Sequence, residues 1–204
     1  MSNTNRHVDT GKHLMMFADE VQISCSDCGA PGVVRANWIP YKWHAHFKCS
    51  NCHLALSSEA GDWIGPICLS GRRPCGHCGH RWLTPCVEYA VAPAELPAQI
   101  PASCPECGRQ TLVDAVLARS FPEDRCCDPH LGLRLRLAVD TRHGVIWAYN
   151  LQHLNELSDY VTAKLRVRQN AGNRAMFSRL PKWMKHAKHR DEIAKALCTL
   201  KTLV

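Results

Sequence analysis

The sequence predicts an α+β protein in which two small tandem cysteine modules, each built on short β-hairpins, precede a β-hairpin and helical C-terminal domain. Two observations predict this class. Four Cys-x-x-Cys pairs fall between residues 25 and 107, and beyond residue 130 an alternating apolar pattern gives way to apolar residues that recur every three to four positions. The chain therefore divides into a flexible lead-in (1–20), the two modules (21–70 and 71–120), a linker (121–130) and a basic C-terminal domain (131–204).

The composition indicates a folded protein that needs no membrane. Of the 204 residues, 46% are apolar and 21% are charged, which is a globular balance. No apolar run is long enough for a signal peptide or a membrane span, so we expect a soluble, cytoplasmic protein without a membrane partner. The 13 cysteines are odd in number and mostly paired by spacing. This pattern favours metal-bound thiolates in a reducing compartment over a disulfide scaffold.

The cysteine pairs predict two structural Zn²⁺ ions. Two thiolates two residues apart on a tight turn reach one zinc ion at about 2.3 Å each, and a second pair completes a closed tetrahedral site. We expect the pairs to combine in sequence order, because segments of hairpin length make this the shorter closure, although crossed pairing remains the alternative. The predicted zinc ligands are Cys25, Cys28, Cys49, Cys52, Cys75, Cys78, Cys104 and Cys107.

Both modules have the layout of a zinc ribbon. The 20 residues between Cys28 and Cys49 fit one hairpin, and the second module repeats this plan with a longer hairpin loop, using a strand near residues 87–91. A glycine directly after a Cys-x-x-Cys turn, here called a knuckle, lets backbone amides turn toward the sulfurs. Each module has fewer than about 40 residues, too few for a hydrophobic core alone, so loss of its zinc should unfold it.

Other cysteines and histidines lie near these sites without a predicted role. Three histidines beside the knuckles are possible substitute ligands, but complete Cys₄ sets leave them no vacancy, and we expect exposed side chains at His53, His77 and His80. Small apolar side chains or free thiols are expected at the five remaining cysteines, namely Cys68, Cys86, Cys126, Cys127 and Cys198.

The C-terminal domain begins with a predicted β-hairpin. From Leu133 to Val139 large apolar residues alternate with Arg134, Arg136 and Ala138, which predicts a strand with one buried face and one basic face. Residues 140–144 supply turn chemistry, and the β-prone run 145–149 pairs back.

Helices follow this hairpin. Asn150 is a plausible N-cap for an amphipathic helix over residues 151–168, whose apolar stripe comprises Leu151, Leu154, Leu157, Val161 and Leu165. Two shorter helices are expected after Ser178, with a break near residues 188–191 at which His189 or Asp191 caps the last helix.

Positive charge is concentrated in this last part of the chain. The net charge is +7, yet residues 131–204 hold 14 Lys and Arg against 5 Asp and Glu. No acidic residue occurs from Tyr160 to Arg190, and grouped cations of this kind suit phosphate contacts with DNA or RNA. A solvated basic face and an acidic protein partner are the alternatives. The predicted nucleic-acid-binding residues are Lys164, Arg166, Arg168, Arg174, Arg179, Lys182, Lys185, Lys188 and Arg190, and Arg134, Arg136 and Arg142 extend them.

Two resemblances add to this reading. The cysteine modules resemble transcription-factor-IIB-type zinc ribbons, and the tail resembles a bacterial family of small zinc-ribbon proteins. The tail resemblance rests on segments 146–150, 153–154, 160–166, 179–184 and 187–192. The zinc-ribbon resemblance implies contact with nucleic acid or protein, and the tail resemblance transfers no activity. The tail resemblance also implies a helix-capping Asn at the position of His189.

The sequence favours binding over catalysis, so we expect no catalytic residues. Pro74-Cys75 to Cys78 matches half of a zinc-deaminase motif, but no His-x-Glu precedes it. No His-Glu-x-x-His, Gly-x-Ser-x-Gly or phosphate-binding glycine loop occurs either. We therefore expect a zinc-binding, non-catalytic nucleic-acid-binding protein or accessory subunit. The alternative is a protein adaptor that docks on a larger nucleic-acid-processing or defence complex.

Overall fold

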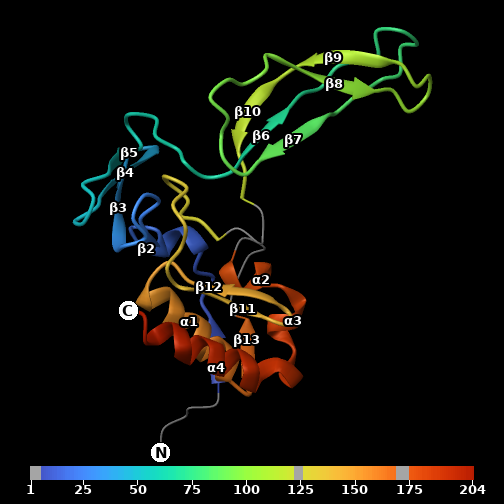
Figure 1. The fold of residues 1–204 in the computed structure, drawn as a ribbon. Helices are drawn as coiled ribbons and strands as arrows, with labels where there is room; N and C mark the ends of the chain where they lie inside the picture. The colour runs from blue at the N-terminus through green and yellow to red at the C-terminus, as the bar shows by residue number, and fades with distance from the viewer. Residues whose placement is uncertain (1–5, 122–125, 169–174) are drawn as a thin grey trace, which may run out of the picture. The chain divides into compact units, whose positions relative to one another are not determined.

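The computed structural model describes residues 6–121, 126–168 and 175–204 as small sheets and short helices (Figure 1). The chain forms two compact units. One combines residues 1–63 with residues 123–204, and the other contains residues 64–122. The mixed α/β class agrees with the prediction, whereas the first cysteine module and the C-terminal elements belong to one unit instead of two. No helix in the described residues is long and apolar enough to cross a membrane.

The first cysteine module is a four-stranded antiparallel sheet. Its strands follow the order β2 (Glu20–Ser24), β3 (Pro31–Ile39), β4 (Lys42–Lys48) and β5 (Ala55–Ser57). Strands β3 and β4 form the hairpin that the spacing between the first two knuckles predicts. Gly32 is needed on β3, because a Cβ atom there would lie 2.6 Å from the Phe47 ring.

The segment predicted as a flexible lead-in is structured from residue 6 onward. Strand β1 (Arg6–Asp9) pairs in parallel with β13 (Leu165–Arg168), and the 3₁₀ turn η1 (Leu14–Phe17) buries Phe17. The Phe17 ring stacks on His153 with centroids 5.1 Å apart. The prediction is wrong for these residues because their partners come from the far end of the chain, where no local pattern reveals them.

The predicted C-terminal hairpin is present and short. Strands β11 (Ala138–Thr141) and β12 (Gly144–Trp147) pair antiparallel. The alternating leucines before them are buried as predicted, but most of that stretch is an extended segment that bonds to β2 through an isolated bridge from Leu135 to Ile23.

Helix α1 (Leu151–Thr162) starts at the predicted N-cap and ends early. Asn150 Oδ1 accepts the backbone N–H of His153 at 2.9 Å. The helix stops at Thr162 instead of residue 168 because residues 165–168 pair with β1. Arg166 then donates to the carbonyls of Tyr160 and Val161 in the last helical turn, which would otherwise lack partners.

Three short turns and one longer helix complete this unit. They are α2 (Met176–Arg179), α3 (Lys182–Lys185), η2 (Ala187–His189) and α4 (Arg190–Lys201). The helix break falls within the predicted range, at His189. The apolar stripe of α4 is fully buried at Ile193, Leu197 and Leu200. Helix α4 packs on α1 and on the β11–β12 hairpin.

The second unit differs from the predicted repeat of the first module. Strand β6 (Ile67–Ser70) lies between β10 (Val116–Arg119) and β7 (Cys86–Tyr89), and β8 (Gln99–Ser103) pairs with β9 (Gln110–Asp114). The strand predicted near residues 87–91 thus pairs with β6, a segment assigned to the first module by sequence. One buried cluster of this unit comprises Cys75, Leu83, Ala102, Cys104 and Val113, and Ile67, Leu69 and Ile100 are buried as well.

Candidate metal centres

Each Cys-x-x-Cys pair forms the same tight turn. The backbone N–H of its first cysteine donates to the carbonyl five residues later, at 2.8 to 2.9 Å in all four turns. The bonds are Cys25 to Ala30, Cys49 to Leu54, Cys75 to His80 and Cys104 to Arg109. Strands β2, β4 and β8 end immediately before three of these turns. The sheets therefore fix where the sulfurs lie.

The residue after the second cysteine has a positive φ in every turn. It is glycine in three of them, with φ of 71° at Gly29, 74° at Gly79 and 69° at Gly108. The fourth turn has His53 in this position, with φ of 63°. This conformation suits glycine, because an L-residue there brings its Cβ close to the following carbonyl oxygen.

The eight sulfurs gather into two groups in sequence order. The first Cys₄ group is Cys25, Cys28, Cys49 and Cys52, and the second Cys₄ group is Cys75, Cys78, Cys104 and Cys107; all sulfurs of one group lie within 4.8 Å of one another. This grouping agrees with the expected sequential pairing and excludes the crossed alternative.

Sulfur spacing in both groups fits a tetrahedral ion. The Sγ–Sγ distances are 3.5 Å for Cys25–Cys52 and 3.6 Å for Cys28–Cys49. They are 3.8 Å for Cys75–Cys107 and 3.6 Å for Cys78–Cys104. Four sulfurs at about 2.3 Å from one Zn²⁺ lie about 3.8 Å apart, whereas a disulfide needs about 2.05 Å. Both groups are therefore suited to hold a metal ion, which would supply structural support and no open coordination position.

The electrostatics of the two groups also favour a cation. Hydrogen bonds from the Asn51 side chain and the Ala30 backbone lower the pKa of Cys28 to about 6. Backbone hydrogen bonds from Cys78 and His77 lower the pKa of Cys75 to about 6.

In each group the pKa of a second thiol is raised. A backbone N–H favours the thiolates of Cys52 and Cys78, yet burial and the facing sulfurs raise both pKa values to about 12. The facing sulfurs thus resist a further negative charge, and a divalent ion at the centre would relieve this repulsion.

The histidines beside the turns stay outside both Cys₄ groups. His53 and His77 are exposed, and His77 Nε2 lies 3.1 Å from the carbonyl oxygen of Gln110. His80 is half-buried, 3.9 Å from Glu106.

The cysteines outside the groups differ from the prediction at one pair. Cys68 on β6 and Cys86 on β7 form a disulfide in the structure, whereas the sequence predicts small apolar side chains or free thiols there. Pairing of β6 with β7 brings the two cysteines together, and their spacing in the sequence does not predict this contact. In the described part of the chain Cys127 and Cys198 are free thiols, as predicted.

The predicted cationic residues separate into exposed and internal ones. Arg174 lies outside the described residues, and so does the side chain of Arg168. Lys164, Arg179, Lys182 and Lys188 are exposed, while Arg166, Lys185 and Arg190 are half-buried. Arg166 acts within the fold, since its guanidinium donates to three backbone carbonyls, those of Tyr160, Val161 and Lys185.

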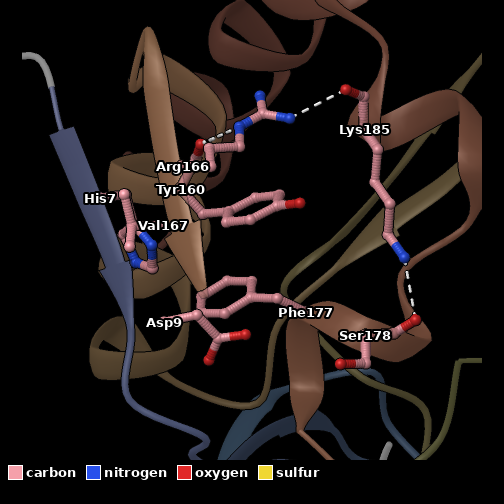
Figure 2. Close-up of a pocket in the computed structure, with 8 residues that line it drawn as sticks. All are labelled: His7, Asp9, Tyr160, Arg166, Val167, Phe177, Ser178 and Lys185. Atoms are coloured by element: carbon pink, nitrogen blue, oxygen red, sulfur yellow. Dashed lines mark hydrogen bonds between the residues drawn. The ribbon is translucent and has the colours of Figure 1, made fainter. Parts of the chain in front are cut away.

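A cavity of about 430 Å³ is lined in part by Arg166 and Lys185. Figure 2 shows its stacked rings, with Arg166 over Tyr160 and Phe177 on the other side. Tyr160 and Phe177 are 4.3 Å apart between centroids, and His7 meets both edge-on. Lys185 Nζ donates to the Ser178 carbonyl at 2.9 Å. Much of this polar lining therefore stabilises the junction of β1, β13 and α2.

The structure also assembles three potential ligands that the sequence analysis missed, His143, His189 and Glu192. They come from the β11–β12 turn and the start of α4, so no single motif contains them. The spacing of His189 and Glu192, three residues apart at a predicted helix start, is the one local signal.

Comparison of the chain with protein-family models, with curated proteins and with solved structures gives no match. The resemblances to zinc-ribbon families therefore remain predictions.

Proposed function

We propose that the chain is a non-catalytic nucleic-acid-binding protein whose two Cys₄ groups each hold one structural Zn²⁺. In this proposal the zinc ions stabilise the two cysteine modules, and exposed cations between residues 164 and 190 contact phosphates. The protein works alone or as an accessory subunit of a nucleic-acid-processing complex.

The observation that supports phosphate binding is the exposure of Arg179, Lys182 and Lys188. They lie on consecutive short turns, α2, α3 and η2, in a stretch without acidic residues. Among the described residues, none of the three takes part in an ion pair within 4.0 Å. Exposed cations that the fold does not neutralise can bind phosphate oxygens and release counterions.

A second candidate function is a protein adaptor, and the tip of the β3–β4 hairpin favours it. Trp38 is 59% exposed, Ile39 is 49% exposed and Tyr41 is 96% exposed. Exposed aromatic side chains are enriched at the centres of protein interfaces. This tip would bind an apolar groove of a partner protein.

A salt titration tests the nucleic-acid proposal. We expect binding to a short duplex DNA, or to an RNA of the same sequence, to weaken linearly on a logarithmic salt scale. The slope should be near −0.9 for each duplex phosphate neutralised. Changing Arg179, Lys182 and Lys188 together to Glu should abolish binding and flatten the slope.

A charge-matched control makes this test specific. Changing the exposed Arg109, Lys195 and Lys201 to Glu alters the net charge equally and should leave most of the affinity. Equal losses in the two triple variants, or binding that salt does not weaken, would contradict phosphate contacts at this surface. Capture of a partner protein that is lost in Trp38→Ser and Tyr41→Ser would support the adaptor instead.

A further inference from the structure

We propose that His143, His189 and Glu192 form a third metal site, which binds one divalent first-row transition ion. This site is separate from both Cys₄ groups and goes beyond the proposed nucleic-acid binding, with which it shares no residue.

The three side chains are close enough to share one ion. Their ligand atoms all lie within 4.8 Å of one another. The His143 and His189 rings are 3.9 Å apart between centroids, and His143 Nε2 lies 3.5 Å from Glu192 Oε2. Two imidazoles and one carboxylate are a ligand set typical of zinc, iron or nickel sites that keep positions open for water or a substrate.

Rigid elements hold the ligands in place. The Thr141 hydroxyl accepts the His143 N–H at 3.2 Å and donates to the Gly144 carbonyl at 2.7 Å, which fixes the turn that carries His143. Gly144 has φ of 139°, and a Cβ atom there would lie 3.3 Å from the Trp183 ring. His189 and Glu192 are three residues apart at the start of α4, a spacing that places both on one face.

His189 occupies a position where a different residue would serve the helix better. It is the N-cap of α4 but makes no side-chain capping hydrogen bond. Asn, Asp, Ser or Thr usually fills this role, because its side-chain oxygen accepts a backbone N–H in the first turn of the helix. The imidazole instead faces His143.

Arg142 now supplies the positive charge between two of the ligands. Its Nη2 lies 2.7 Å from Glu192 Oε2, and its Nε donates to His143 Nε2 at 3.1 Å. The guanidinium thus contacts two of the ligand atoms that a metal ion would bind. Because the Arg142 side chain is 73% exposed, it can move into solvent without unfolding its surroundings. Arg142 would therefore compete with a metal ion for Glu192 and His143.

Metal counting on the whole chain tests this proposal. Protein with both Cys₄ groups filled by zinc is dialysed against Co²⁺, and total metal per chain is measured. We expect the total to rise from two to three. The added cobalt should lack the strong thiolate charge-transfer absorption that cobalt in a Cys₄ group shows. Each of the single variants His143→Ala and Glu192→Gln should return the total to two. The variant Arg142→Gln should bind cobalt at least several-fold more tightly.

A matched control uses another histidine–carboxylate pair. His44 Nδ1 lies 2.6 Å from Glu59 Oε1, and among the described residues neither belongs to a group of three potential ligands, so His44→Ala should leave the third ion bound. If His143→Ala fails to fold, Glu192→Gln decides the test. A total of two in the natural chain would overturn the proposal, even if Arg142→Gln binds a third ion. A third ion that persists in both ligand variants would overturn it as well.

Discussion

The two Cys₄ groups share one local geometry and differ in what supports them. Strand β2 of the first group exchanges backbone hydrogen bonds with the C-terminal region. Its Gln22 N–H donates to the Tyr149 carbonyl at 2.7 Å, and its Ser24 N–H donates to the Arg134 carbonyl at 2.9 Å. The second group stands in a unit of its own, where Cys75 and Cys104 belong to a buried cluster of five residues.

The same ligand set can therefore stabilise a fold locally or globally. In the second unit the ligands are themselves core residues, so loss of the ion removes both the crosslink and the centre of the packing. In the first unit the buried side chains of α1 and α4 form a core without any metal ligand, and the sheet of the first group is anchored to it.

The largest expected effect comes from removing one buried ligand of each group. Cys49→Ser and Cys104→Ser are matched, since both residues follow the end of a strand and both are buried. A structural zinc contributes an apparent ~10 to 16 kcal/mol in peptides, against a typical domain stability of ~5 to 15 kcal/mol. Cys104→Ser should therefore unfold residues 64–122, whereas Cys49→Ser should loosen only the sheet of the first group.

Two tryptophan indole signals in a nuclear magnetic resonance spectrum check this expectation. Trp82 reports on the second unit, and Trp147, on β12, reports on the first. Cys104→Ser should lose the folded signal of Trp82 and keep that of Trp147. If Cys49→Ser loses the folded signal of Trp147, both groups stabilise globally and the contrast between them fails.

A smaller effect concerns acid, and it should be confined to the first unit. His153 is 2% exposed, and burial lowers its pKa to about 3 from the model-peptide value of 6.5. The unfolded chain therefore binds one more proton between these pH values. Stability from the neutral imidazole is full above pH 6.5 and is lost as the pH falls toward 3. Between pH 7 and pH 5 the loss should be about 2 kcal/mol.

The variant His153→Gln isolates this contribution. It removes the titrating ring, so the denaturant midpoint followed by Trp147 should fall less between pH 7 and pH 5 than in the natural chain. The Trp82 midpoint in the second unit should show the same pH dependence in both proteins. An unchanged acid response of Trp147 in His153→Gln would show that another group carries it.

Local signals predicted a large part of this fold. The four knuckle turns, the β3–β4 hairpin and the N-cap at Asn150 all follow from residues within a few positions of each other. These features depend on turn chemistry, side-chain periodicity and capping, which short segments carry within themselves.

Pairings between distant segments could not be predicted. Strand β1 pairs with β13 across almost the whole chain, and this pairing ends α1 earlier than its apolar stripe suggests. The position of β6 between β7 and β10 is equally nonlocal, and it creates the contact between Cys68 and Cys86. A single sequence contains no local pattern that identifies such distant partners.

The candidate sites show the same division. The identity and pairing of the ligands in the Cys₄ groups follow from the spacing of the cysteines. The role of an individual Lys or Arg side chain does not follow from the sequence. Arg166 counts as one positive charge in the sequence, yet its guanidinium closes the end of α1. The group of His143, His189 and Glu192 exists because α4 packs on the β11–β12 hairpin.

The smallest expected effect exchanges one residue between the two Cys₄ groups. His53 has φ of 63° where Gly79 has φ of 74° in the second group. The left-handed conformation costs a non-glycine residue about 1 to 2 kcal/mol, while glycine costs about 0.5 to 1 kcal/mol in chain entropy. His53→Gly should therefore stabilise the first group by about 0.5 kcal/mol. Nothing within 4 Å obstructs a Cβ at Gly79, so Gly79→His should destabilise the second group through backbone conformation alone, by a similar amount. Denaturant midpoints of the zinc-loaded variants measure both changes, and a lower midpoint in His53→Gly would show that the exposed imidazole makes a compensating contact.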